Sequence, residues 1–155
     1  MSFRITGLSP APFAPLYGLS DADLVTRGVR RVRADAHPGY PDRVELRDAD
    51  LGETLLLLNH EHQPAPTPYR SAHAIFVLEG ATRPAVFVDE VPTALRRRSV
   101  SLRAFDAAHE MVDADLVDGE VLGDLIERFL SRPAIAYLHA HYAKRGCYAA
   151  LVERG

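Results

Sequence analysis

The sequence predicts an α+β fold in which a mainly antiparallel, curved sheet carries two or three helices packed on it. Ten short segments rich in Val, Leu, Ile, Phe and Tyr are bounded by Gly, Pro or Asp, a pattern typical of strands and their turns. Only two or three segments have helical features, and most strand segments follow one another through short turns. Strands joined by turns favour an antiparallel sheet, on which the few helices then pack.

Two short helices are expected first along the chain. One begins at Ser20, whose hydroxyl can accept a hydrogen bond from a free amide of the first turn, and ends before Gly28. Another begins near Pro92 and carries Arg96, Arg97 and Arg98. Positive side chains are favourable at a helix C-terminus, which is where these arginines would lie.

The longest expected helix follows Asp118. From Leu122, apolar residues recur at i, i+3, i+4, i+7 and i+8, and Pro133 prevents much extension. The apolar stripe that results should lie on the sheet.

The expected strands share enrichment in β-branched and aromatic residues. They are residues 3–6, 29–34, 43–47, 54–62, 73–79, 84–88, 99–105, 111–117, 134–142 and 147–153. The chain of 155 residues has the length of one domain, and no shift in composition marks an internal linker. The prolines of QPAPTPYR indicate a stiff loop between two strands. We therefore expect one domain over residues 1–155.

Composition and charge exclude several classes of partner. Eighteen basic and 21 acidic side chains give a net charge of -3, which provides no broad positive field for nucleic acid. Apolar runs such as the four leucines at residues 55–58 are far shorter than the roughly 18 residues that a membrane span needs. The N-terminus lacks the pattern of a secretory signal, and the one cysteine cannot form an intramolecular disulfide. We expect a cytoplasmic protein without a nucleic-acid or membrane partner.

Histidines are the most informative residues. Five of the seven fall in the stretches NHEHQPAPTPYRSAH and LHAH. Alternate residues of a strand face the same way, so His60 would project with His62, and His139 with His141. Neutral imidazoles on neighbouring strands can chelate Zn²⁺ or Fe²⁺, which makes His62, His73, His139 and His141 the candidate metal ligands. Because H-x-H is not a specific motif, a metal-free polar pocket built from the same residues is the alternative.

Cys147 offers a second chemistry. In the stretch YLHAHYAKRGCY it follows a basic turn, where Lys144 would help to stabilise a thiolate. A thiolate nucleophile needs a base nearby, and the candidates are His62, His73 and His141. The alternative is an inert cysteine packed in a strand, because free cysteine is among the most buried residue types.

The end of the proline-rich loop supplies candidate ligand-binding residues. Tyr69 and Arg70 are adjacent there, and a guanidinium can form paired hydrogen bonds to a carboxylate or phosphate. With His139 and Lys144 they make up the expected set of ligand-binding residues. Arg70 could equally tie the loop to a carboxylate such as Glu61.

Four segments carry a resemblance to a known family: FRITGLSPAPFAPLYGLSDADL, HPGYPDRVELRDADLGETLLLLNHEHQPAPTPYRSAHAIFV, LRAFDAAHEMVDADLVDG and YLHAHYAKRGCYAALVER. Over nearly the whole chain they resemble the bacterial family known as domain of unknown function 1203 (DUF1203). Its pattern is similar to E-H-Q, P-Y-R, a following His and H-x-H-x-A-K-x-G-C-Y, which fall here at residues 61–63, 68–70, 73 and 139–148. The resemblance implies a small single-domain bacterial protein and implies no activity.

The chain departs from the family pattern at two positions. It has His60 where the family more often has an aromatic residue, which argues against His60 as a required ligand. It has Asp42 after P-G-Y-P, where the family has a cysteine. No dithiol is therefore available, and Cys147 would react alone or with an outside thiol.

The sequence thus favours a small-molecule enzyme with a histidine-rich polar pocket. Two chemistries stay open: metal-assisted hydrolysis with zinc or iron, and acyl-type chemistry with a cysteine nucleophile. The alternative class is a non-catalytic domain that binds a small ligand or a partner. A third possibility is a structural oligomer, such as a homodimer, in which unpaired strand edges pair across a symmetry axis.

Overall fold

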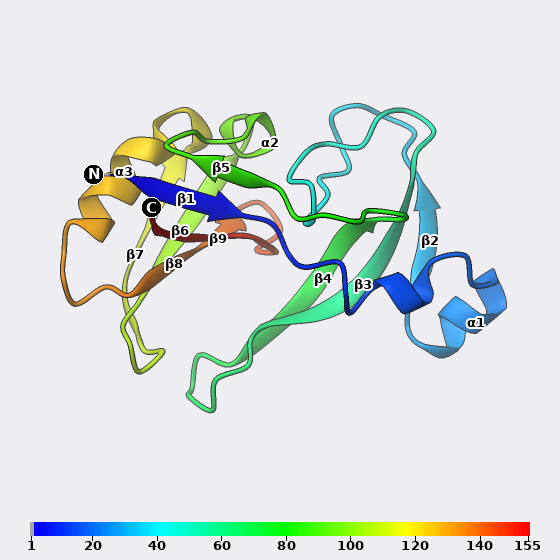
Figure 1. The fold of residues 1–155 in the computed structure, drawn as a ribbon, viewed down its shortest axis with the longest axis horizontal. Helices are drawn as coiled ribbons and strands as arrows, with labels where there is room; N and C mark the ends of the chain where they lie inside the picture. Colours follow the sequence, from blue (N-terminus) through cyan, green and yellow to red (C-terminus); the bar gives the residue numbers. More distant parts are fainter. Residues whose placement is uncertain (1) are drawn as a thin grey trace.

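The computed structural model describes residues 2–155 and contains two antiparallel sheets (Figure 1). One sheet has six strands, in the order β5 (Val86–Val88), β1 (Phe3–Thr6), β9 (Tyr148–Arg154), β8 (Tyr137–Tyr142), β6 (Ser99–Phe105) and β7 (Met111–Asp118). The other has three, in the order β2 (Arg30–Arg33), β3 (Thr54–Gln63) and β4 (Ser71–Leu78). The α+β class is confirmed, but the single curved sheet expected from the sequence is corrected to two. Hydrophobic alternation identifies a strand and carries no information about its distant partners.

The expected helices are present. Helix α1 (Asp21–Thr26) begins where expected, with the Ser20 hydroxyl oxygen accepting a hydrogen bond from the backbone N–H of Asp23 at 3.1 Å. Helix α2 (Thr93–Arg96) follows Pro92, with a basic residue in its last turn. Two short 3₁₀ helices, η1 (Ala14–Leu16) and η2 (Gly119–Val121), complete the helical elements of residues 2–155. No described helix is both long enough and apolar enough to span a membrane.

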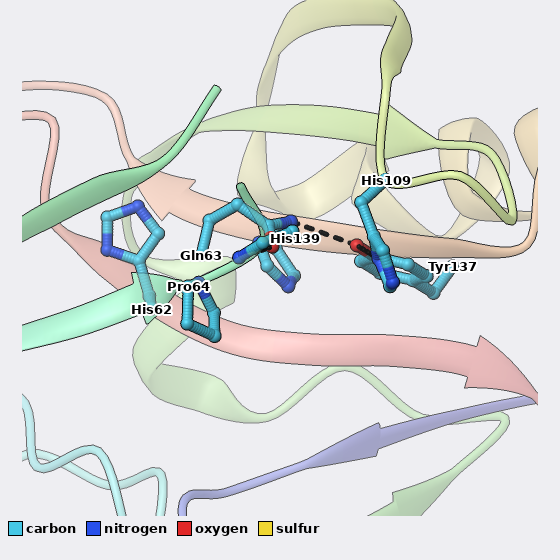
Figure 2. Close-up of a pocket in the computed structure, with 7 residues that line it drawn as sticks. His62, Gln63, Pro64, His109, Tyr137 and His139 are labelled. Carbon is cyan, nitrogen blue, oxygen red and sulfur yellow. Dashed lines mark hydrogen bonds between the residues drawn. The ribbon is translucent and has the colours of Figure 1, made fainter. Parts of the chain in front are cut away.

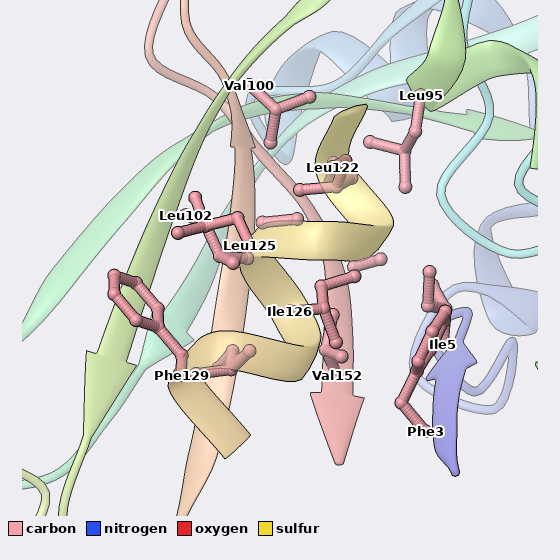
Figure 3. Packing of buried hydrophobic residues seen from close by; sticks show 14 of the residues in the cluster. Phe3, Ile5, Leu95, Val100, Leu102, Leu122, Leu125, Ile126, Phe129 and Val152 are labelled. Carbon is pink, nitrogen blue, oxygen red and sulfur yellow. The ribbon is translucent and has the colours of Figure 1, made fainter. Parts of the chain in front are cut away.

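Helix α3 (Leu122–Leu130) covers one face of the six-stranded sheet (Figure 3). Its buried side chains are those of the apolar stripe that predicted the helix: Leu122, Leu125, Ile126, Phe129 and Leu130. They pack against residues of β1, β6 and β9, such as Ile5, Leu102 and Val152. Full burial of one such side chain stabilises the fold by about 1.5–3 kcal/mol. This core holds β8 and β9 in place.

The three-stranded sheet has its own hydrophobic core. Buried side chains of β3 and β4, including Leu56 and Val77, pack with Leu24 of α1 and with Phe13 just before η1. Figure 1 shows this sheet beside the six-stranded one, with the chain crossing between them after β1 and again after β4. The N-terminal strand therefore belongs to a different sheet from the elements that directly follow it.

Residues 43 and 44 join the two crossings. The carbonyl of Arg43 accepts from the backbone N–H of Leu8 at 2.8 Å, and the carbonyl of Val44 accepts from the N–H of Ala85 at 2.8 Å. Gly7 donates to the Ala85 carbonyl at 2.9 Å. A Cβ atom on Gly7 would lie 2.0 Å from the Val44 oxygen, so this position requires a residue without a side chain.

The strand expected at residues 43–47 is absent, and that prediction was wrong. The nine other expected strands are present, with ends that differ by three residues or fewer. The buried carboxylate of Asp42 accepts hydrogen bonds from the backbone N–H groups of Val44, Glu45 and Leu78. Because a side chain satisfies these amides, the segment needs no neighbouring strand.

Replacing two glycines tests the packing of Gly7 against residues 43 and 44, which we call the junction. Gly7→Ala should lower the free energy of unfolding by at least about 3 kcal/mol, because the methyl group meets backbone that cannot move aside. Gly123→Ala is the matched control: its Cβ would lie 3.9 Å from Val91 Cγ2, and alanine favours the helix, so it should be neutral or stabilising by up to about 1 kcal/mol. Urea denaturation measures both. Equal effects of the two changes would contradict the packing at Gly7.

Candidate functional site

Strands β3 and β8 bring three histidines together at the interface of the two sheets. The ring centroid of His62 lies 4.8 Å from that of His141 and 6.2 Å from that of His139, and the last two are 6.4 Å apart. Tyr148 of β9 stacks on His62 with 5.3 Å between centroids and 12° between planes. The β3–β4 pairing is irregular between Glu61 and Gln63, where His62 lies. We call His62, His139 and His141 the histidine cluster.

The histidine cluster is incompletely hydrogen-bonded, and its members are buried or, for His62, half-buried. His139 is 6% exposed and His141 1% exposed. Nδ1 of His141 lies 3.0 Å from the Gly146 carbonyl oxygen, to which it can donate, and Nε2 of His62 lies 2.8 Å from the Ser71 hydroxyl. Nδ1 of His62 and Nδ1 of His139 are buried and have no hydrogen-bond partner in the described part of the chain. An unsatisfied buried polar atom costs about 1–3 kcal/mol, so these two nitrogens mark a place where a bound group would be stabilising.

Burial keeps the cluster neutral. It is the largest cause that lowers the pKa of His62 to about 4 and the pKa values of His139 and His141 to about 3. The positive charge of Arg103 and the neighbouring histidines lower these pKa values further, and the Gly146 carbonyl opposes the shift at His141. At pH 7 each imidazole therefore has a free lone pair and one N–H group.

A cavity of about 350 Å³ opens beside the cluster and is lined by His62, Gln63, Pro64, Ala65, His109, Tyr137 and His139 (Figure 2). We call it the histidine pocket. The Tyr137 hydroxyl accepts a hydrogen bond from Gln63 Nε2 at 2.9 Å and lies 2.7 Å from His109 Nδ1. The pocket thus combines neutral imidazoles with an exposed histidine that contacts a phenol.

Sequence reasoning missed several residues of this site. His109 lies in the β6–β7 turn with a φ of 64°, which is uncommon for a residue with a side chain. Tyr137 lies two residues before His139 on β8, so strand alternation places it on the same face, but it was not among the predicted site residues. Ser71 at the start of β4 gave no signal of its contact with His62 because that contact depends on how β3 and β4 are aligned.

His73 does not join the histidine cluster. It is paired across strands with His60, and its Nδ1 lies 2.9 Å from the carbonyl oxygen of Ala74. As the side chains stand, no three His, Cys, Asp or Glu residues in positions 2–155 are arranged to hold a metal ion. The expected four-histidine metal site is therefore not preformed, and three of its four members are gathered.

Cys147 lies in a different pocket from the cluster. Its sulfur accepts a hydrogen bond from Arg43 Nη2 at 3.0 Å, and among residues 2–155 no histidine is hydrogen-bonded to it. It lines a cavity of about 730 Å³ that also contains Lys144 and that we call the arginine pocket. The expected cysteine and histidine residues thus do not form a nucleophile and base pair in this structure.

Tyr69 and Arg70 lie at the end of the loop between β3 and β4, directly before β4, and outside both pockets. The Nε atom of Arg70 is 2.9 Å from a carboxylate oxygen of Glu61, and both side chains are largely exposed. The ion pair with Glu61, the alternative to ligand binding, is present. Such exposed pairs contribute little, about 0–1 kcal/mol.

The neutral cluster should make stability depend on pH. Below about pH 6.5 the unfolded chain binds protons that the folded histidines do not bind, so the stabilisation is present above that pH and is lost as pH falls towards 4 for His62 and towards 3 for His139 and His141. Between pH 6.5 and 5.0 we expect a loss of about 1.5 kcal/mol for each of His139 and His141, and less for His62. Urea denaturation at several pH values measures the slope. His139→Phe should reduce the slope of the free energy of unfolding against pH. A free energy of unfolding that does not change over this pH range would contradict the burial of neutral histidines.

Comparison with known proteins supports one family assignment. The sequence model of the family described as "Protein of unknown function (DUF1203)" matches residues 39–154. The match covers all residues of the histidine cluster, together with Arg43 and Cys147. No curated protein and no solved structure gives a significant match. The chain belongs to the DUF1203 family.

Proposed function

We propose that this protein is a small-molecule enzyme whose reaction centre is the histidine cluster and whose substrate enters through the histidine pocket. The observation that carries the proposal is the pair of buried Nδ1 atoms, on His62 and His139, that have no hydrogen-bond partner among residues 2–155. Both residues also line the pocket. A group bound there would remove the cost of leaving the two nitrogens unsatisfied.

The reaction we propose is metal-assisted hydrolysis. An imidazole with a pKa of about 3 or 4 is a weak base at neutral pH, so general-base catalysis by the cluster would be inefficient. The same property favours metal binding, because no proton competes for the lone pairs. A bound zinc or iron ion would supply a Lewis acid and an acidic water molecule.

The positions of the rings support this chemistry. Two imidazoles on one tetrahedral zinc have centroids roughly 5 Å apart, as follows from a Zn–N distance of about 2 Å. His62 and His141 are already near that separation, and His139 would have to move by about 1 Å. His62 would bind the metal in one of two ways. Either its Nε2 atom gives up the contact with Ser71 and binds the ion, or its unpartnered Nδ1 atom binds the ion.

Two further groups have roles in this scheme. Tyr137 and His109 face the same pocket and are 2.7 Å apart between hydroxyl oxygen and Nδ1, so they can pass a proton between substrate and solvent. Gln63 holds the Tyr137 hydroxyl from the other side. The alternative function is non-catalytic: the same neutral imidazoles would then only hydrogen-bond a small ligand.

We also propose a cytoplasmic bacterial protein that acts on a small molecule and has neither nucleic acid nor membrane as a partner. A single cysteine and a net charge of -3 support this. Homodimer formation stays a proposal. It is supported by the edge strands β5 and β7, on which Val86, Val88, Val112 and Leu116 are exposed.

Metal content is the direct test of the chemistry. Protein prepared without a histidine tag should bind about one equivalent of zinc or iron, measured by elemental analysis after dialysis. His139→Ala and His141→Ala should lose it, whereas His73→Ala, which alters a histidine outside the cluster, should retain it. Absence of metal from the wild type, or equal retention by all variants, would contradict metal-assisted hydrolysis.

Hydrolysis of p-nitrophenyl esters and phosphoesters tests whether the cluster or Cys147 carries the reaction. His139→Ala should lower the rate by roughly 100-fold or more, while Cys147→Ser should leave it within a factor of about two. The reverse ranking would favour the cysteine mechanism. If no substrate is turned over and a screened ligand raises Tm only when His139 is intact, the non-catalytic alternative is correct.

A further inference from the structure

The arginine pocket is a second cavity that the proposed hydrolysis does not use. Its volume of about 730 Å³ lies in the range of small-molecule sites. It lies between residues 35–43, the end of α2 and the turn that joins β8 to β9. None of the residues that line it also lines the histidine pocket.

Positive charge is concentrated in this pocket. Five basic side chains line it, Arg43, Arg97, Arg98, Lys144 and Arg145. Two carboxylates oppose them: Asp35 in the wall, and Asp48, whose oxygens lie 3.1 Å from Arg97 Nη1 and 2.6 Å from Arg98 Nη2. The pocket therefore has an excess of three positive charges in a protein whose net charge is -3.

Arg43 is the strongest indication of an anionic ligand. It is 1% exposed, and within residues 2–155 no carboxylate lies within ion-pair distance of it. It donates to the carbonyl of Tyr148 at 2.7 Å, to the carbonyl of Pro41 and to the sulfur of Cys147. A guanidinium has five N–H groups, so three are satisfied and two remain. A buried cation without a counter-ion is unfavourable unless an anion binds beside it.

Neighbouring groups extend the set of donors. Two guanidinium groups lie close to the Tyr142 ring, whose centroid is 5.0 Å from Arg43 Cζ and 5.1 Å from Arg98 Cζ. Burial raises the pKa of Tyr142 to about 12, so its hydroxyl keeps its proton at neutral pH. Tyr40 and Phe76, 5.3 Å apart between ring centroids, form an aromatic wall for the organic part of a ligand.

We propose that the arginine pocket binds a small molecule that carries a phosphate group, with Arg43 at the buried end and Lys144 and Arg145 at the rim. A phosphate group brings up to two negative charges and several acceptor oxygens, which match three unopposed cations better than a single carboxylate does. Arginine forks recognise phosphate through paired hydrogen bonds. This site is separate from the histidine cluster and does not depend on its chemistry.

Pyrophosphate is the probe for the first test. By isothermal titration calorimetry it should bind wild-type protein with about one site, and the Lys144→Ala/Arg145→Ala variant should bind it roughly tenfold more weakly or worse. Both residues are exposed, so the fold should survive the change. The Arg27→Ala/Arg30→Ala variant removes the same charge from an exposed surface outside the pocket and should bind as the wild type does.

Cys147 reports on the buried end of the pocket because it is the only cysteine and contacts Arg43. Pyrophosphate should slow the reaction of this thiol with iodoacetamide, and sodium chloride of equal ionic strength should not. His139→Ala should bind pyrophosphate normally, which separates this result from the test of the histidine cluster. No calorimetric binding, or the same affinity in both double variants, would overturn the proposal.

Discussion

The buried guanidinium of Arg43 is the interaction on which the rest of the structure depends. The backbone carbonyls of Arg43 and Val44 together join the two segments that cross between the sheets, and the Arg43 side chain reaches the Tyr148 carbonyl and the Cys147 sulfur. These contacts fix β9, and through it β8, against the three-stranded sheet. Leaving such a group without its partners would cost several kcal/mol, a large fraction of the stability of an ordinary domain.

This junction creates the histidine cluster. His62 comes from one sheet and His139 and His141 from the other, so the distances of 4.8 and 6.2 Å from the His62 centroid to theirs exist only when the sheets are correctly docked. Docking also removes the imidazoles from water, which is the main cause of their low pKa values. The same contact thus brings the three rings close together and keeps them neutral, and a neutral imidazole is what the proposed metal binding requires. The docking of the two sheets also leaves the arginine pocket beside Arg43, where positive charge is not fully opposed.

Local features of the fold could be predicted from the sequence, and long-range ones could not. The Ser20 cap and the apolar stripe of α3 depend on neighbours within a few residues, and both are confirmed. The division into two sheets depends on pairings such as β1 with β5 and β9, which alternation does not specify. The strand expected at residues 43–47 failed because the Asp42 carboxylate satisfies the amides that a strand would pair. Strand alternation correctly grouped His139 with His141. It gave no means of seeing that Cys147 and Lys144 belong to another pocket, or that His73 lies apart from the cluster.

A long-range ¹H–¹⁵N NMR spectrum of the histidine side chains tests the neutral histidine cluster directly, because it reports the protonation and ligation of each ring nitrogen. We expect His62, His139 and His141 to be neutral at pH 6 and one equivalent of zinc to shift their resonances together, with those of His73 unchanged. Protonated rings at pH 6, or cluster resonances that do not respond to zinc, would contradict a neutral imidazole centre.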